Sequence, residues 1–292
     1  MFLIRQIIRS IQLLFPHVLV DGFVFTERGE VRHENWGDDI NYYFLKNIVC
    51  VPLLIYNQLS IAFRFNPKHY LIIGSVIDML CKPNTIVWGS GILHGPQTLR
   101  VKPLKVLAVR GPLTRDVLLD NNIECPEIYG DPALLLPLYY APKIEKKYKY
   151  GIINHNFSID GYDTLTMDGQ KLDERTDVLK IDLSKYEKWT DIIDQILSCD
   201  GIISYSLHGL IVSEAYKVPN VWIEFDEVLY GGHFKFHDFF LSIGRDREKP
   251  VAIKNKKIES KVIDKALSSW KPGSIDLQPL INACPFAINL RK

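Results

Sequence analysis

The sequence predicts an α/β protein made of two doubly wound domains that face a cleft. Its 292 residues suggest two domains, because one domain typically holds roughly 100–200 residues. Short, continuous apolar runs alternate with helical patterns, as in parallel sheets that are buried on both faces. This rhythm stops in the proline- and lysine-containing stretch 131–150 and then restarts. We therefore expect domains over residues 1–140 and 148–292, with the last helix packing back on the first domain.

The first half begins with an apolar stretch from Met1 to Val20 that Arg5 and Arg9 interrupt. The residues at helical spacing in it are Leu3, Ile4, Ile7, Ile8, Ile11 and Leu14. This pattern is neither a convincing signal peptide nor a membrane span, which needs ~20 mainly apolar residues. We expect a helix that packs on the domain, with an interfacial helix at the inner membrane face as the alternative. The strands expected next are 70–74, 85–89, 106–110 and 127–130, and the helices are 37–48 and 112–119.

The second half repeats the pattern. Strands are expected at 150–154, 178–182, 201–204 and 220–223, and helices at 189–198, 207–216, 234–243 and 257–270. Charged residues make up 24% of the chain and the net charge is +1, which argues against a general nucleic-acid surface. The five cysteines are widely spaced without a CxxC pair, so neither a zinc site nor a disulfide framework is indicated. A reducing, cytoplasmic compartment fits this usage.

The most informative segment is 204–215, where a buried strand ends in two serines and a His-Gly pair that open a helix. Ligands of open α/β sheets bind at the carboxyl ends of the strands, and a helix N-terminus favours an anion. We expect Ser204, Ser206, Leu207 and Gly209 to bind an anionic donor. His208 is the expected acid–base catalyst beside it.

Arg110 ends an apolar strand and is followed by Gly111 and a helix that begins at Pro112. A guanidinium group at a helix N-terminus suits phosphate or carboxylate. The alternative is a structural ion pair with an acid such as Asp131, but we favour donor binding.

Other strand ends and helix starts supply candidates for a second substrate. Asp38 and Asp39 can serve as a base or bind a hydroxyl, although a pair of carboxylates alone does not make a metal site. The glycine-rich loop 89–95 is either a tight turn or a close approach of backbone to a ligand. The residues expected to bind this second substrate are Asn35, Trp36, Gly91, His94, Asp131 and His155.

Four motifs, in this order, resemble the polysaccharide pyruvyl transferase family. They are Asn35-Trp36-Gly37-Asp38-Asp39, Arg110-Gly111-Pro112-Leu113-Thr114, Gly130-Asp131-Pro132-Ala133 and the segment 204–209 with its helix. The resemblance implies a GT-B-like fold with two Rossmann-type domains. It also implies transfer of a pyruvyl group from phosphoenolpyruvate to two hydroxyls of one sugar, in bacterial surface-polysaccharide biosynthesis. Galactose and N-acetylmannosamine, as 4,6-ketals, are the candidate acceptors.

In this resemblance the family's arginine maps to Arg110 and its histidine to His208. Some relatives carry a second arginine where this chain has Ser206, so another cation, such as Lys217 or Arg245, would have to substitute. The implied chemistry requires no metal or other cofactor. Peripheral contact with the inner membrane and a lipid-linked acceptor stay open.

Two alternatives remain from the residues. One is a GT-B-type glycosyltransferase that uses a nucleotide sugar, whose diphosphate would occupy the same helix N-terminus. The other is a non-catalytic glycan-binding protein of an assembly complex. The histidine and arginine at the expected cleft make the last alternative the weakest.

Overall fold

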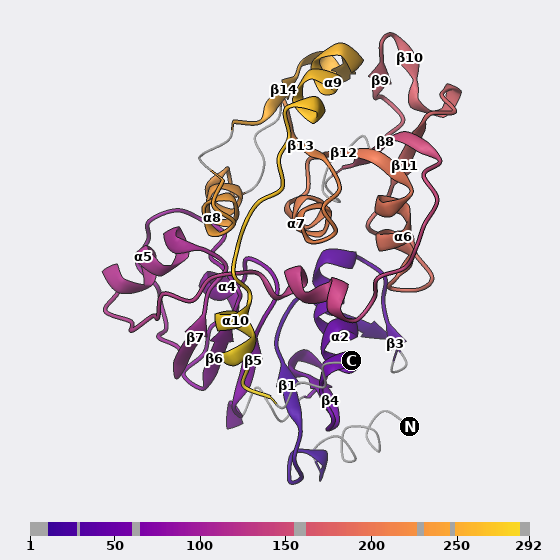
Figure 1. Ribbon diagram of the computed structural model, residues 1–292. Helices are drawn as coiled ribbons and strands as arrows, with labels where there is room; N and C mark the ends of the chain where they lie inside the picture. The colour runs from indigo at the N-terminus through magenta and orange to yellow at the C-terminus, as the bar shows by residue number, and fades with distance from the viewer. Residues whose placement is uncertain are drawn as a thin grey trace.

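The computed structural model describes residues 11–27, 30–59, 65–154, 162–226, 231–245 and 249–286. Two five-stranded parallel sheets flanked by helices dominate this part of the chain, so the predicted α/β class is confirmed. Figure 1 shows the first sheet at one end of the molecule and the second at the other, with α2, α7 and α8 between them.

The first sheet has the strand order β4-β1-β5-β6-β7. Every neighbouring pair in it is parallel. Its strands are β1 (Val18–Val20), β4 (Leu53–Ile55), β5 (His69–Leu71), β6 (Thr85–Trp88) and β7 (Lys105–Ala108). The helices of this half are α2 (Trp36–Ile48), α4 (Ile77–Leu80) and α5 (Pro112–Asp120), and the shorter elements are β2 (Thr26–Glu27), β3 (Glu30–Val31) and η1 (Tyr56–Gln58).

Three details of the first half differ from the prediction. β1, which follows the residues at helical spacing, was not predicted as a strand; its residues Val18, Leu19 and Val20 are buried and it pairs with a parallel strand on each side. The run 127–130 makes a single bridge, Tyr129 with Val109, instead of a strand. β4 was not predicted either.

The second sheet has the order β11-β8-β12-β13-β14 and is also parallel. Its strands are β8 (Tyr148–Ile153), β11 (Val178–Ile181), β12 (Cys199–Ser204), β13 (Asn220–Phe225) and β14 (Val251–Ile253). The helices are α6 (Asp191–Leu197), α7 (Leu207–Ala215), α8 (Phe234–Ser242) and α9 (Ser260–Ser268). A small sheet that was not predicted joins β10 (Gln170–Lys171), β9 (Thr166–Met167) and β15 (Lys257–Ile258), near η3 (Leu172–Glu174) and η4 (Lys254–Lys256).

The two sheets share one hydrophobic core. The 3-10 helix η2 (Pro132–Leu138) follows the first sheet and packs against α7 of the second half. After α9 the chain runs back to the first sheet, where α10 (Gln278–Asn282) lies (Figure 1). The indole N–H of Trp88 donates to the Leu280 carbonyl at 2.9 Å, and Phe286 packs edge-on against Trp88. The last helix is therefore part of the core beneath the first sheet.

The expected N-terminal helix lies largely outside the described residues, which begin at Ile11. Residues 11–12 are helical, and beyond them Leu14 and Phe15 expose 81% and 64% of their surface. Across the described ranges, no helix has both the length and the apolar character that a membrane crossing requires.

Candidate active site

The N-terminus of α2 carries the predicted pair of carboxylates, and the two are held differently. Asn35 caps the helix by accepting a hydrogen bond from the Gly37 amide, and its side-chain N–H donates to Asp38 at 2.6 Å. Asp39 is buried and accepts hydrogen bonds from the Tyr186 hydroxyl at 2.8 Å and from the Asn35 amide. Burial raises the pKa of both Asp38 and Asp39 to about 7. Asp39 thus joins the two halves, whereas Asp38 is bound by the side chain of the capping Asn35.

His208 lies directly over the start of α2. A Cβ atom added to Gly37 would fall 2.1 Å from Nδ1 of His208 and 2.5 Å from its Cγ, so the ring occupies the space that any other residue at position 37 would need. The first turns of α2 and α7 are therefore in contact. The structure brings together two motifs that are far apart in the sequence, as the expectation of one site requires.

The turn before α7 uses its serines internally. The Ser204 hydroxyl donates to the Ser206 carbonyl at 2.8 Å and accepts from the Ser206 amide at 3.1 Å. Ser206 is the N-cap residue of α7 and is buried, and Leu207 and Gly209 lie in the first helical turn, also buried. Ser204 therefore shapes the turn, and the first turn of α7 is the part of this motif that can face an anion.

Lys235, which was not among the predicted site residues, lies near the predicted residues Asp38 and Arg110. It lies in the first turn of α8 and exposes 7% of its surface. Burial lowers the pKa of Lys235 to about 8, and nearby Arg110 lowers it as well, while Asp38 acts in the opposite direction. Within the described residues its ammonium group has no hydrogen bond or ion pair, and its nitrogen lies 5.4 Å from the centre of the Phe236 ring. A nearly buried ammonium without a carboxylate bound to it is a receptor for an anion.

A signal for Lys235 exists in the sequence. Lys235 and Asp238 are three residues apart, and with Phe239 they occupy the buried side of α8. Two charges on the apolar face of a helix indicate partners elsewhere in the fold or a ligand.

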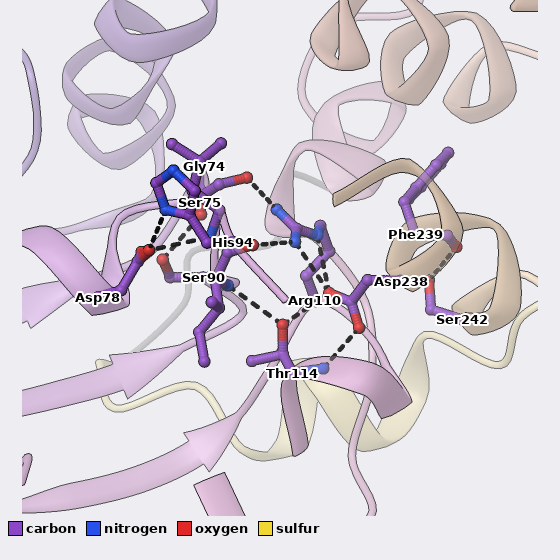
Figure 2. Close-up of polar contacts among 12 residues, drawn as sticks. Gly74, Ser75, Asp78, Ser90, His94, Arg110, Thr114, Asp238, Phe239 and Ser242 are labelled. Carbon is purple, nitrogen blue, oxygen red and sulfur yellow. Dashed lines mark hydrogen bonds and ion pairs between the residues drawn. The ribbon is translucent and has the colours of Figure 1, made fainter. Parts of the chain in front are cut away.

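Arg110 is enclosed and not exposed to a donor in this arrangement (Figure 2). Its Nε donates to Asp238 at 3.0 Å, one terminal nitrogen donates to the Ser75 hydroxyl, and the other donates to the Ile92 carbonyl at 2.9 Å and pairs with Asp238. Asp238 also accepts from the amide and the hydroxyl of Thr114. The structure shows the structural ion pair that was considered as the alternative to donor binding, but its acid is Asp238 and not Asp131, and it ties α5 to α8.

Gly91 and Asp131 border this ion pair. A Cβ at Gly91 would lie 2.3 Å from the Arg110 guanidinium carbon, so the glycine makes room for the arginine. Asp131 is fully buried and caps η2 through the Ala133 amide at 2.9 Å. Burial raises the pKa of Asp131 to about 6. Both residues are buried, and their role in binding an acceptor stays a prediction.

Trp36 belongs to the core. It exposes 1% of its surface, and its indole N–H donates to the Trp189 carbonyl at 2.7 Å. It links the two halves and offers no face on which a sugar ring can stack. Asn35, as the N-cap residue, is only partly buried and stays beside Asp38.

His94 lies on the loop after β6, and its Nδ1 is 3.0 Å from Asp78 of α4 (Figure 2). His155, another candidate, is outside the described residues. The two cations considered as substitutes at position 206 lie elsewhere. Lys217 is exposed after the far end of α7, and Arg245 pairs with Glu214, which also binds Trp270 and Gly273.

No metal centre is apparent in this region. Within the described ranges, no group of three or more His, Cys, Asp or Glu side chains is arranged to hold a metal ion. A cavity of about 810 Å³ lies at the amino end of β7, lined by residues such as Lys102, Leu104 and Cys125, and holds none of the predicted site residues. We assign no chemistry to that cavity, because the perturbed charges gather at the opposite, carboxyl end of the strands.

Comparisons with known proteins cover the part of the chain that carries the four motifs. The model of the polysaccharide pyruvyl transferase family matches residues 22–227. An uncharacterized protein of Acanthamoeba polyphaga mimivirus is 30% identical over 224 residues, which cover 75% of this chain and 74% of that protein. The succinoglycan biosynthesis protein ExoV of Rhizobium meliloti (strain 1021) is 28% identical over 238 residues, covering 76% of this chain and 67% of that protein. No solved structure matches the chain.

The family match includes the contact between Gly37 and His208, which brings the α2 and α7 motifs together. The matched range ends before α8, so it does not include Lys235. Because the match covers well over half of the chain, this protein belongs to the polysaccharide pyruvyl transferase family and is a transferase of pyruvyl groups.

Proposed function

We propose that the protein transfers the pyruvyl group of phosphoenolpyruvate to two hydroxyls of one sugar, forming a cyclic ketal and releasing phosphate. One observation carries the proposal: Asp38, His208 and Lys235 lie in the first turns of three helices whose N-termini meet between the sheets. Helix N-termini, a lysine and a histidine together suit a donor that carries both a phosphate and a carboxylate.

The reaction defines what these groups must do. A proton goes to the methylene carbon C3 of the donor, and one sugar hydroxyl adds to C2. The bond between C2 and the phosphate oxygen then breaks, and the second hydroxyl adds to C2. Two hydroxyl protons are lost, one of them balanced by the proton on C3 and the other by the proton on the departing phosphate. We assign protonation of C3 to His208, charge stabilisation of the donor to Lys235, and deprotonation of one hydroxyl to Asp38.

The resemblance suggests that Arg110 binds the donor, whereas in this proposal it has a structural role. With each of its three nitrogens bound to the protein, it positions the loops around the donor and does not contact it. The buried ammonium of Lys235 then supplies the cation that Ser206 lacks. Asn35 orients Asp38, and the amides of Leu207 and Gly209 face the anion.

The acceptor and the setting are inferred from the relatives. ExoV is named for succinoglycan biosynthesis, so a polysaccharide precursor is the acceptor that we propose here. Galactose and N-acetylmannosamine, as 4,6-ketals, remain the sugars to test, with and without a lipid carrier. We also propose a cytoplasmic enzyme with a GT-B-like arrangement of domains 1–140 and 148–292, each carrying one parallel sheet.

The test is phosphate release from phosphoenolpyruvate with a panel of galactosides and N-acetylmannosaminides. Acceptor-dependent release that falls at least about 10²-fold in His208→Ala supports the proposal. Exposed Lys217→Met serves as a matched control and should keep its activity. Stabilisation by a nucleoside diphosphate, with no release from phosphoenolpyruvate for any acceptor, would indicate a glycosyltransferase instead.

A further inference from the structure

Two serines follow neighbouring strands of the first sheet, and their hydroxyl groups are bound differently. Ser90 follows β6 and is fully buried, and its hydroxyl donates to the Gly74 carbonyl at 2.8 Å. Ser75 follows β5, pairs with Gly91 in a single parallel bridge and is only partly buried. One terminal nitrogen of Arg110 binds its hydroxyl (Figure 2). The hydroxyl of Ser90 is thus used within the fold, whereas that of Ser75 is bound by a cation.

The direction of the hydrogen bond between Arg110 and Ser75 follows from the chemistry of the two groups. A guanidinium group carries donors and no acceptor, so Arg110 donates and the Ser75 oxygen accepts. A hydroxyl that accepts a hydrogen bond keeps its own hydrogen for a second partner. Among the residues that the structure describes, no group accepts that hydrogen. The Ser75 hydroxyl can therefore donate to a ligand.

Thr114 also carries a hydroxyl at this ion pair, and it has no such capacity left. Its oxygen accepts from the Ile92 amide at 3.2 Å and donates to Asp238 at 2.7 Å. In Figure 2 the Ser75 hydroxyl and the Asp238 carboxylate approach the guanidinium group of Arg110 from opposite sides. The side of the guanidinium group that lies away from Asp238 is therefore bound by a hydroxyl that can still donate.

Ser75 lies beside the groups proposed to act on the substrates. It follows Gly74, and a Cβ atom added to Gly74 would lie 3.9 Å from Oδ1 of Asp38. The charges of Arg110 and Asp38 both act on the buried ammonium group of Lys235, so these three groups are neighbours. Because Ser75 is bound to Arg110 and follows the residue that faces Asp38, it borders the same space.

The bond from Arg110 determines which ligand group suits the Ser75 hydroxyl. Hydrogen bonds in a chain polarise one another, so a hydroxyl that accepts from a cation donates more strongly. Such a hydroxyl gains most from an anionic oxygen, because hydrogen bonds to ionised groups are roughly twice as strong as those between neutral groups. The phosphate and the carboxylate of phosphoenolpyruvate provide anionic oxygens, whereas a sugar provides neutral hydroxyls. The chemistry therefore favours phosphoenolpyruvate over the sugar.

We propose that the Ser75 hydroxyl donates a hydrogen bond to an anionic oxygen of phosphoenolpyruvate, and that Arg110 is the positioning residue that orients this hydroxyl. The inference rests on the proposed function, since it takes phosphoenolpyruvate as the pyruvyl donor. Arg110, which is enclosed by the protein, thereby acts on the substrate through Ser75, whereas Lys235 binds it directly. The contact contributes to binding and neither makes nor breaks a covalent bond.

The experiment compares Ser75→Ala and Ser75→Thr with the wild type by calorimetric titration with phosphoenolpyruvate and by steady-state phosphate release. Ser75→Ala loses a hydrogen bond to an ionised group, so the Kd and the KM for phosphoenolpyruvate should rise roughly 10–150-fold. The kcat should change less than about threefold, because the contact is present both before and during the reaction. Ser75→Thr keeps the hydroxyl, and its Kd should stay within about threefold of wild type.

Ser90→Ala is the matched control, because it removes a serine hydroxyl at the end of the neighbouring strand. Both alanine variants lose a hydrogen bond within the protein, so the Tm should fall in both. Only Ser75→Ala should also weaken the binding of phosphoenolpyruvate. The control thus separates a loss of stability from a loss of binding.

Inorganic phosphate and pyruvate distinguish the two anionic groups of phosphoenolpyruvate. If the Ser75 hydroxyl binds the phosphate, calorimetric titration should show a lower affinity of Ser75→Ala for inorganic phosphate and an unchanged affinity for pyruvate. The reverse result assigns the contact to the carboxylate. Either result supports the proposal and identifies the group that is bound.

Three results would overturn the proposal. The first is a Kd of Ser75→Ala for phosphoenolpyruvate within about threefold of wild type. The second is an equal rise of this Kd in Ser90→Ala, which would show a structural effect. The third is a higher KM for the sugar with an unchanged affinity for phosphoenolpyruvate, which would assign the hydroxyl to the acceptor. If the wild-type protein neither binds phosphoenolpyruvate nor releases phosphate from it, the proposed function itself fails, which is a distinct outcome.

Discussion

Two buried cations lie side by side where the sheets meet, and they are bound in opposite ways. Arg110 has a protein partner for each of its three nitrogens and shares Asp238 with Thr114. Lys235 is almost as deeply buried, but its ammonium group has no carboxylate within ion-pair distance in the described part of the chain. A satisfied cation holds a fold together, whereas an unsatisfied one costs stability that only a ligand recovers. The comparison separates the structural cation from the one that we propose binds the donor.

The largest effect is expected on breaking the Arg110 pair. Asp238→Ala leaves a charged guanidinium buried without its counter-ion, which typically costs about 3–5 kcal/mol of the free energy of unfolding. Urea denaturation measures the loss. Glu34→Ala removes the exposed partner of Arg32 and should cost less than about 1 kcal/mol. Equal losses in the two variants would contradict a structural role for Arg110.

Lys235→Met should separate binding from stability. Removing a charge-assisted hydrogen bond to the donor costs about 1.5–3 kcal/mol, which corresponds to roughly 10–150-fold in KM for phosphoenolpyruvate. The free energy of unfolding should stay the same or rise, because methionine carries no charge to bury. Steady-state kinetics and urea denaturation measure the two quantities. An unchanged KM for phosphoenolpyruvate would remove Lys235 from the donor site.

Gly37→Ala tests the contact between the two motifs. The added Cβ would fall 2.1 Å from the His208 ring, so the ring or the helix must move, at a cost of about 1–3 kcal/mol and with a large loss of kcat. Gly22→Ala is the matched control, because its nearest neighbour would be 3.6 Å away. Differential scanning calorimetry and phosphate release report the two effects. Full activity in Gly37→Ala would show that the position of the His208 ring does not matter.

The smallest expected effect is on how the stability of the protein depends on pH. Burial raises the pKa of Asp38 to about 7, so between about pH 4 and 7 the native state binds more protons at this residue than the unfolded state. Its contribution to stability is therefore greatest at low pH and is lost as the pH rises through 7. Asp38→Asn should gain about 1 kcal/mol or more relative to wild type between pH 5 and pH 8, measured as a change in Tm. Exposed Asp200→Asn is the control, and an equal gain there would contradict the assignment to burial.

The alternation of strands and helices was predictable where apolar runs were continuous. β5, β6, β8, β12 and β13 each overlap an expected strand, since both faces of a parallel sheet are buried. β1 and β4 were not found in this way, and they pair with each other at one edge of the first sheet, a contact that the sequence pattern does not reveal. Residues 257–258 pair with β9 before α9 begins at Ser260, a tertiary contact that helical spacing does not reveal.

For the candidate site, too, the sequence predicts local positions but not the contacts between segments that are far apart in the chain. The position of Asp38 and His208 in the first turns of two helices was predictable from the sequence, whereas their catalytic roles stay predictions. The partner of Arg110 was not predictable, since no spacing in the sequence relates a strand end of the first half to a residue of α8. Trp36 was read as a sugar contact, although its indole N–H is satisfied by the second half of the chain.

Because the end of the chain returns to the first sheet, that sheet is completed only late in synthesis. The strands made first acquire the Leu280 partner of Trp88 only when residue 280 has been added. At about 5–20 residues per second, this leaves Trp88 without that cover for on the order of ten seconds after β6 is made. Until then a newly made first sheet presents an apolar surface to the cell, and a chaperone that binds such surfaces has that interval in which to act.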